Sequence, residues 1–507
     1  MTPYDTALRA DCFATSRNLF DLLLAELIDP VTGELPHAEL EVLCEQRGRR
    51  LVRQLLQDHL DLRADREETR LTAAHPPGRL EKGHHRLLAT VVGTVTVRRC
   101  ALRLPGRRNR YPADEVLALP AGRHSHGLAR LAVAEAVRGS FDAAHAAITG
   151  RCGHVIGKRQ VEDLVIAAAA DVEAFYAARI PLPRSAAELL VLSTDGKGIV
   201  MRPEALRPAT RAAAARHRGR FRTRLASGEK PYRKRMATLA VLYDAVPAPR
   251  RPHDVISLGE RSGARRVRAG PRASGKWIYA SVISSAEHVI AFMFDQAEAR
   301  DSLHARTWVV LADGDHHQIQ LLQAEAERRH TRIHIVCDLI HVLEYLWRAA
   351  RCLHTADDPA AEQRVAGWAL ALLAGRPEEV IADLTARTTS RGDALSVAAR
   401  YLTSHRAFLR YDQALEQGWP IATGVVEGSA RYLIGDRLDI TGARWGLAGA
   451  EAILKLRALI ANNDLDPYWI SHVDRENQRV HHSRHPDEYT LTRESTSAGQ
   501  AVANPGR

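Results

Sequence analysis

The sequence predicts a multidomain protein that combines a mixed α/β domain with largely helical regions. Its 507 residues exceed what one compact domain usually holds. Apolar residues recur three or four positions apart near both ends of the chain, as in amphipathic helices, whereas the middle contains short apolar runs of strand length. We therefore expect helical regions before, within and after a central sheet.

The N-terminal part of the chain predicts helices followed by a small β structure. Residues 1–80 are assigned to a helical region, because leucines are spaced three and four apart between Leu19 and Leu60. Residues 81–185 are assigned to a short β hairpin and a helix-turn-helix-like DNA-binding region. The hairpin is expected around Gly93, where valines alternate with small or polar residues.

The helix-turn-helix prediction rests on two helical segments, one from Ser140 to Ile148 and one from Lys158 onward, separated by a glycine-containing turn. The residues expected in its core are Phe141, Ala144, Ile148, Val161 and Leu164. The side chains expected to face DNA phosphates are Arg151, Lys158 and Arg159. An ordinary helical hairpin shows the same pattern, so both interpretations stay open.

The α/β domain is predicted from four apolar runs of strand length, namely Glu188–Thr194, Met236–Val246, Thr307–Ala312 and Arg332–Cys337. It is expected to occupy residues 186–341, with basic loops between strands, and residues 418–476. Residues 342–417 read as a helical insertion between these two parts. Residues 477–507 are polar and are expected to form a disordered tail.

Positive charge is concentrated in one part of the chain. Lys and Arg number 71 against 60 acidic residues, for a net charge of +11. The segment Arg202–Arg235 alone holds twelve basic residues and two acidic ones. A basic run is often only a solvated surface, but this density favours contacts with DNA phosphates. The expected contacts here are Lys197, Arg216, Arg218, Arg220, Arg222, Arg224, Arg233, Lys234 and Arg235.

The remaining composition argues against a membrane or secreted protein. No stretch approaches the roughly 18 apolar residues needed to span a bilayer, and the first twenty residues lack the pattern of a signal peptide. Six scattered cysteines in 507 residues form no disulfide framework. We therefore expect a cytoplasmic protein without membrane contacts.

Three carboxylates are the strongest candidates for chemistry. Asp195 and Asp313 each follow a predicted strand, and Glu427 begins a predicted helix. If the two strands are neighbours, both aspartates meet at one edge of the sheet, where they would bind Mg²⁺ or Mn²⁺. The alternatives are that each Asp only caps a loop and that Glu427 only pairs with Arg431 on a helix surface.

Five separated motifs, in this order along residues 80 to 475, resemble those of ISKra-type insertion-sequence transposases. They are Ser193–Pro203, Lys234–Ala237, Leu311–Asp315, Asp338–Trp347 and Thr441–Gly446. The resemblance implies a DDE transposase with a ribonuclease-H-like catalytic core. Asp195, Asp313 and Glu427 would be its three acids and metal ligands, and His341 would be a further catalytic residue.

The resemblance also implies partners and a location. An enzyme of this class would use two Mg²⁺ or Mn²⁺ ions, bind double-stranded DNA at element ends and target sites, and act as a homo-oligomer. It would be associated with the bacterial nucleoid. Two other functions stay open: a ribonuclease-H-like nuclease that cuts DNA without joining it, and a non-catalytic helix-turn-helix regulator.

Overall fold

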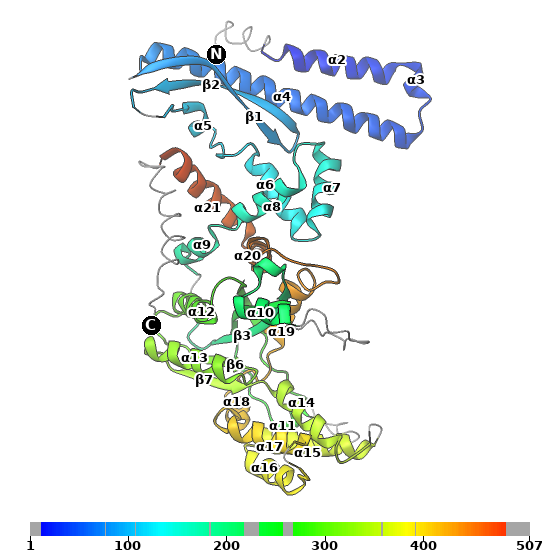
Figure 1. The fold of residues 1–507 in the computed structure, drawn as a ribbon, viewed down its shortest axis with the longest axis vertical. Coiled ribbons are helices and arrows are strands. Elements are labelled where there is room, and N and C mark those ends of the chain that lie inside the picture. The colour runs from blue at the N-terminus through cyan, green and yellow to red at the C-terminus, as the bar shows by residue number, and fades with distance from the viewer. Residues whose placement is uncertain are drawn as a thin grey trace. The chain divides into compact units, whose positions relative to one another are not determined.

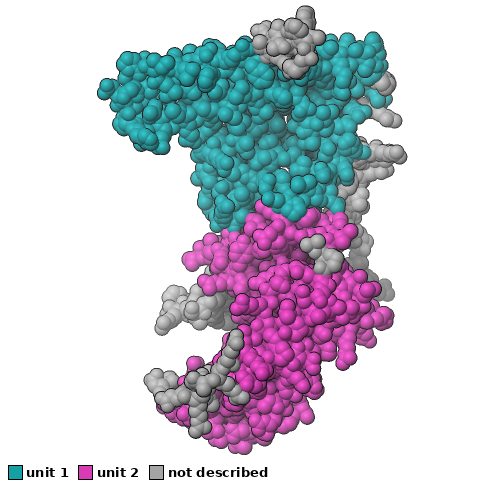
Figure 2. Space-filling model, turned by 180° about the vertical axis from the view of Figure 1, so that it is seen from behind, with its two compact units in different colours: residues 1–171, 466–507 teal, residues 172–465 magenta. Residues whose placement is uncertain are grey.

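The computed structural model describes residues 12–76, 78–106, 108–181, 184–216, 233–256, 267–355, 358–390 and 392–482. The chain divides into two compact units (Figures 1 and 2). Unit 1 contains the chain up to Asp171 together with the segment from Asp466 onward, and unit 2 contains Val172–Leu465. Within the described ranges, no helix is long and apolar enough to cross a membrane.

Unit 1 begins with helices that pack on a β hairpin. Its first elements are α2 (Ala14–Ile28), α3 (Pro30–Gly33), α4 (His37–Ala74), β1 (Arg79–Thr90) and β2 (Gly93–Arg103). The strands are antiparallel, and Gly93 adopts a positive φ of 123° at the turn. Leu60 of α4 packs with Leu88, Val95 and Val97 of the hairpin. The hairpin is longer than the sequence predicts, but it turns at the expected position.

Four further helices of unit 1 follow the hairpin, and the last three of them pack against one another. The elements that follow the hairpin are α5 (Pro112–Val116), α6 (His126–Ala136), α7 (Phe141–Cys152) and α8 (Lys158–Ala168). Ser140 caps α7 by accepting a hydrogen bond from the Ala143 N–H. Ala144, Ile148 and Val161 are buried as predicted, whereas Leu164 is only half-buried because Val165 occupies the core position.

The last described helices belong to unit 1 and correct two predicted boundaries. They are α21 (Leu465–Asn477) and a π-helical turn η4 (Gln478–His482). Arg479 and His472 both donate to Asp171. Burial alone would raise the pKa of Asp171, but these two partners hold it well below its usual value. The α/β unit therefore ends at Leu465 rather than at residue 476, and the predicted tail is helical up to His482. Residues 483–507 lie outside the described residues.

Unit 2 is built on a five-stranded mixed sheet. Its strands are β3 (Leu189–Val200), β4 (Lys234–Ala245), β5 (Ala273–Ser281), β6 (Trp308–Ala312) and β7 (Ile333–Cys337), in the spatial order β5-β4-β3-β6-β7. The pairs β3–β4 and β4–β5 are antiparallel, whereas β3–β6 and β6–β7 are parallel. Leu190 and Leu192 on one face, and Val191 and Val309 on the other, are almost fully buried, so the centre of the sheet is apolar on both faces.

Two strands differ from the sequence-based expectation. β3 continues through Asp195 to Val200 instead of ending at residue 194, because its second half pairs with β4. β5 lies partly within a segment that was predicted to be a basic loop. Only its second half, from Trp277 to Ser281, is buried, so its polar first half gives no strand signal in the sequence.

Helices surround this sheet and fill the segment between β7 and the last part of the unit. Before β7 the helices are α9 (Val172–Ala178), η1 (Pro203–Ala205), α10 (Pro208–Arg216), α11 (Pro252–Val255), α12 (Ala286–Arg300) and α13 (His316–Arg328). The inserted helices are α14 (Leu339–Ala350), α15 (Pro359–Leu373), α16 (Pro377–Ala386), α17 (Ala394–Ser404), η2 (Arg406–Phe408) and α18 (Tyr411–Glu416). α19 (Gly424–Ala430), the π-helical turn η3 (Arg431–Gly435) and α20 (Leu447–Ala461) complete the unit.

Candidate active site

The parallel pairing of β3 with β6 places two of the predicted acids together. The strands are in register from Leu190 opposite Trp308 to Ser193 opposite Leu311, and the Ser193 hydroxyl donates to the Leu311 carbonyl over 3.0 Å. Asp195 and Asp313 each lie two residues beyond the last of these pairs. Both aspartates therefore lie at the carboxyl end of the parallel pair, close enough for the charge of Asp313 to raise the pKa of Asp195.

The pKa of the Asp195 carboxyl group depends on its burial and on its neighbours, one of which is Asp313. The Asp195 carboxyl group is half-buried, and burial raises its pKa. The Gly196 N–H, which donates to Oδ1 over 2.6 Å, lowers that pKa, the negative charge of Asp313 raises it, and Lys197 lowers it. The net effect is a raised pKa, which means that ionising Asp195 beside Asp313 costs free energy in the folded protein.

The helical insertion fixes the loop that carries Asp313. The Tyr401 hydroxyl of α17 donates to the Asp313 carbonyl over 3.1 Å. Nε2 of the buried His405 lies 2.7 Å from the Gly314 carbonyl. Gly314 has a φ of +96°, and a Cβ atom added there would collide with the Tyr401 hydroxyl. The loop therefore requires glycine for both its conformation and its contact with α17.

His341 lies in an aromatic cluster next to this loop. Its ring centroid is 5.4 Å from that of Tyr345 and 6.0 Å from that of Tyr401, and the two tyrosines stack with centroids 4.1 Å apart. His341 is half-buried. The structure thus connects His341 to Asp313 through Tyr401, and its proposed catalytic role stays a prediction.

Glu427 is connected to the end of β7 through Thr423 and Asp338. Asp338, at the end of β7, is 2% exposed and caps α14 by accepting from the Ile340 N–H. The Thr423 hydroxyl lies 2.6 Å from Asp338 Oδ2 and 3.1 Å from Glu427 Oε1, and its single proton can be donated to only one of them at a time. Asp338 is therefore a buried anchor that joins β7 to the start of α19.

Glu427 itself is exposed, on a helix that packs against β3 and β4. The structure does not show the alternative ion pair between Glu427 and Arg431. Arg431 pairs with Asp436 instead, with Nε 3.8 Å from Oδ1. No three His, Cys, Asp or Glu side chains of the described residues converge closely enough to hold a metal ion. The assignment of Glu427 as a third ligand stays a prediction.

The donor chemistry of the aspartate pair fits a hard divalent cation. Carboxylate oxygens are the ligands that Mg²⁺ and Mn²⁺ prefer. Burial and, to a smaller extent, the negative charge of Asp313 raise the pKa of Asp195, and a bound cation would favour its ionised form. Asp195 and Asp313 would hold such an ion, with Glu427 available on the adjoining helix.

The predicted DNA-binding residues occupy different environments. Arg216 and Arg233 of unit 2 are exposed, as are Arg151, Lys158 and Arg159 of unit 1. Lys197 is half-buried on β3. Arg218, Arg220, Arg222 and Arg224 lie outside the described residues.

Two of the predicted contacts are engaged within the protein, and a third belongs to an exposed ion pair. Arg235 donates to the carbonyls of Val282 and Ala205. Its guanidinium therefore holds two segments of the backbone and is not available as a free cation. Lys234 donates to Asp439 over 3.1 Å. On the surface of unit 1, Lys158 pairs with Asp142.

Sequence reasoning missed the residues that position the acids. Tyr401, His405 and Thr423 are each separated by about 85 to 91 residues from the site residue that they contact. No local pattern marks them, since an inward tyrosine or histidine on an amphipathic helix looks like any core residue. Only an alignment that showed paired changes at these positions could have revealed them.

No protein-family model and no curated protein matches this chain. Among solved structures, it is similar to a chain of the "Drosophila P element transposase strand transfer complex", at 10% sequence identity and a TM-score of 0.23. The alignment covers 70% of this chain and 84% of that chain.

The raised pKa of Asp195 predicts that Asp195→Asn stabilises the metal-free protein at about pH 7. A carboxyl group whose pKa is raised by folding contributes stability below its unfolded pKa and loses it as pH rises through the folded pKa. The gain in Tm over wild type should therefore shrink near pH 4, at roughly 2–4 °C per kcal/mol. Asp474→Asn, at an exposed carboxylate of unit 1, is the control. A lower Tm for Asp195→Asn without metal contradicts the assignment.

The geometry of Gly314 predicts that Gly314→Ala destabilises unit 2 by about 1–3 kcal/mol, because the methyl group is strained at positive φ and displaces Tyr401. Urea unfolding measures this loss. Gly367→Ala on α15 is the matched control, since nothing lies within 4 Å of its added Cβ and alanine favours helix. Equal stability of the two variants would show that α17 does not hold the Asp313 loop.

Proposed function

We propose that this protein is a DNA transposase that binds the ends of its own element and catalyses metal-dependent strand cleavage and strand transfer. The observation that carries the proposal is the strand order β5-β4-β3-β6-β7, with Asp195 on the central strand and Asp313 directly after the neighbouring parallel strand. An antiparallel trio extended by two parallel strands is the arrangement of a ribonuclease-H-like core. Three of the segments that resemble motifs of ISKra-type transposases, Ser193–Pro203, Lys234–Ala237 and Leu311–Asp315, include residues of β3, β4 and β6 near this end of the sheet.

The chemistry assigns a role to each side chain. Bound Mg²⁺ or Mn²⁺ supplies charge stabilisation for an in-line displacement at a phosphodiester. Asp195 and Asp313 hold the ions, and Glu427 is the proposed third ligand. Lys197, two residues after Asp195 on the same face of β3, would attract the DNA backbone.

The DNA substrate is proposed to be double-stranded, at both element ends and target. The exposed Arg216 and Arg233 of unit 2 would contact its phosphates, and unit 1 would contribute Arg151, Lys158 and Arg159. Joining two ends to a target requires more than one active site, so we propose that the protein acts as a homo-oligomer on DNA.

A nuclease that cuts without joining could use the same carboxylates, and only its products would distinguish it. A non-catalytic regulator would need only the helices of unit 1. It would give no reason for the half-buried Asp195, whose pKa is raised by burial and by the nearby charge of Asp313.

The proposal predicts that Asp195→Asn and Asp313→Asn each lower strand cleavage by about 1,000-fold, or ~4 kcal/mol of transition-state stabilisation, without weakening DNA binding. The assay incubates purified protein and Mg²⁺ with labelled duplexes taken from the DNA that flanks the gene and with a target plasmid. Asp474→Asn is the control for loss of one carboxylate. Cleavage without joined product supports the nuclease, and full activity of the variants refutes the metal assignment.

A further inference from the structure

Unit 2 contains a basic cavity at the end of the sheet opposite the candidate active site. The cavity has a volume of about 190 Å³ and is lined by residues of α9 and the segment after it, of β4, β5 and α12, and of the segment after α20. Asp244 of its wall is the partner of Leu190, five residues before Asp195 on β3. At about 3.4 Å per residue along a strand, roughly 17 Å separate this wall from Asp195, so the cavity is a different site.

The wall of the cavity carries more positive than negative charge. Its basic residues are Arg179, Arg184, Lys276 and Arg300, and its acidic residues are Asp244 and Asp464. Both carboxylates are already bound within the protein. Asp464 pairs with Arg179 and accepts from the Tyr176 hydroxyl over 3.0 Å.

Asp244 is shared by three arginines. Its side chain is 1% exposed. Oδ1 lies 2.8 Å from Arg306, and Oδ2 lies 3.1 Å from Arg300 and 3.6 Å from Arg184. Asp301, which accepts from the Arg306 N–H, also offsets part of this charge. Even so, Arg184 and Arg300 exceed the single charge of Asp244, so positive charge is left over beside the cavity.

The pKa of Arg300 responds to this arrangement. Burial lowers the pKa of its guanidinium, and the charge of Asp244 raises it. The positive charges of three neighbouring side chains lower it further, namely those of Arg306, Arg184 and Arg179. The net effect is a lowered pKa, which means that keeping Arg300 charged beside the other arginines costs free energy. An anion in the cavity would offset this cost.

The wall also contains a buried hydrogen-bond donor. Trp277 lines the cavity and is 3% exposed, and its indole N–H has no hydrogen-bond partner among the described residues. Its ring stacks with Tyr279 and packs edge-to-face against Tyr176 and Phe292. A buried donor without an acceptor costs free energy, and arginine, lysine and tryptophan side chains only donate. The wall therefore suits a ligand that carries negative charge and acceptor oxygens.

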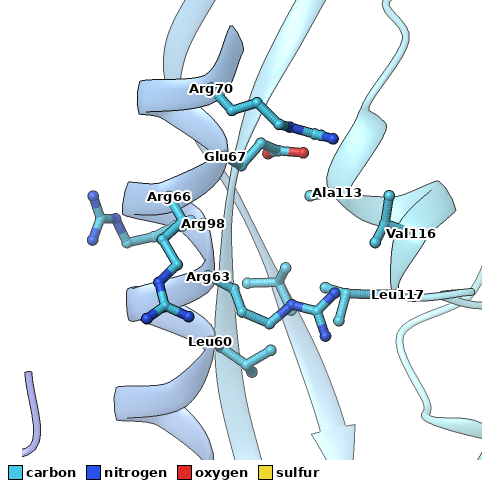
Figure 3. A pocket seen from close by; sticks show the side chains of 11 residues that line it. Leu60, Arg63, Arg66, Glu67, Arg70, Arg98, Ala113, Val116 and Leu117 are labelled. Atoms are coloured by element: carbon cyan, nitrogen blue, oxygen red, sulfur yellow. The ribbon is translucent and has the colours of Figure 1, made fainter. Parts of the chain in front are cut away.

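A cavity of unit 1 shows the opposite arrangement. It is about 280 Å³ in volume and lies between α4, β2 and α5, with Arg63 and Arg70 on either side of Glu67 (Figure 3). Glu67 is 9% exposed, and its Oε2 atom has no hydrogen-bond partner in the described part of the chain. A carboxylate oxygen without a donor repels an anion. The cavity of unit 2, where arginines bind both carboxylates, is therefore the stronger candidate.

We infer that the cavity of unit 2 binds a single phosphate group, held by Arg184, Lys276 and Arg300. Guanidinium groups match the oxygens of phosphate in geometry and charge. A volume of about 190 Å³ admits one such group but not a DNA duplex. Free phosphate and a phosphate of DNA at the mouth of the cavity supply the same chemistry. The inference does not rest on the proposed function, because it uses none of the residues assigned to cleavage or DNA binding.

The test follows thermal unfolding of the full chain in increasing sodium phosphate, and in sodium chloride at matched ionic strength. At about ten times its Kd, phosphate should raise the Tm of wild type by roughly 2–5 °C more than chloride does. Phosphate also stabilises proteins without binding, because it is excluded from their surfaces. The site is therefore measured by the saturable part of the rise.

Arg184→Gln with Lys276→Gln removes two exposed cations of the wall and should increase the half-saturating phosphate concentration by about tenfold or more. Lys276→Arg retains the charge and should keep the wild-type response. Arg332→Gln, at an exposed arginine directly before β7, is the matched control. Three results overturn the inference: a wild-type response in the double variant, an equal rise in chloride, or an equal loss in Arg332→Gln.

A second measurement separates the two sources of the phosphate group. Binding of fluorescein-labelled duplex DNA is followed by fluorescence anisotropy, with and without phosphate. If the double variant loses the response to phosphate but binds DNA as wild type does, the cavity holds free phosphate. If the double variant also binds DNA more weakly, and phosphate competes with DNA only in wild type, the group belongs to DNA.

Discussion

The short parallel register between β3 and β6 is the constraint on which the candidate site depends. Four residue pairs, from Leu190 opposite Trp308 to Ser193 opposite Leu311, decide which side chains lie beyond the end of β6. A shift of one residue would move Asp195 to the other face of the sheet. The apolar core around Leu192 makes such a shift costly, because buried side chains on both faces would have to exchange places.

The helical insertion is coupled to this edge at two separate places. On one side, Tyr401 and His405 bind backbone carbonyls of the Asp313 loop. On the other, the buried Asp338 accepts from both the hydroxyl and the N–H of Thr423, at the start of the helix that carries Glu427. The insertion therefore interrupts the sequence of the α/β unit without being separate from its site. A change in its packing would be transmitted to the acids through hydrogen bonds to backbone and side chain.

The sequence predicts the parts of this site that follow from local patterns. Strands β4, β6 and β7 are visible as apolar runs, and Asp313 is visible as the first polar residue after one of them. The continuation of β3 through Asp195 is not visible in the sequence, because Gly196, Lys197 and Gly198 suggest a loop. Only the pairing with β4 shows that these residues belong to the strand. Unit boundaries also escape local reasoning, since the return of α21 to unit 1 depends on contacts such as that of His472 with Asp171, 301 residues apart in sequence.

The comparison of basic residues shows why charge density alone is an incomplete guide to DNA contacts. Arg235 belongs to the most basic segment of the chain, yet its guanidinium is used to hold two carbonyls, and burial lowers its pKa. Arg123 belongs to no basic run, yet it is exposed and without a described partner. A cation contributes to polyanion binding only when folding leaves its charge unpaired and accessible, so partners and burial decide the outcome, not position in a run. By this criterion the charge available to DNA is spread over both units.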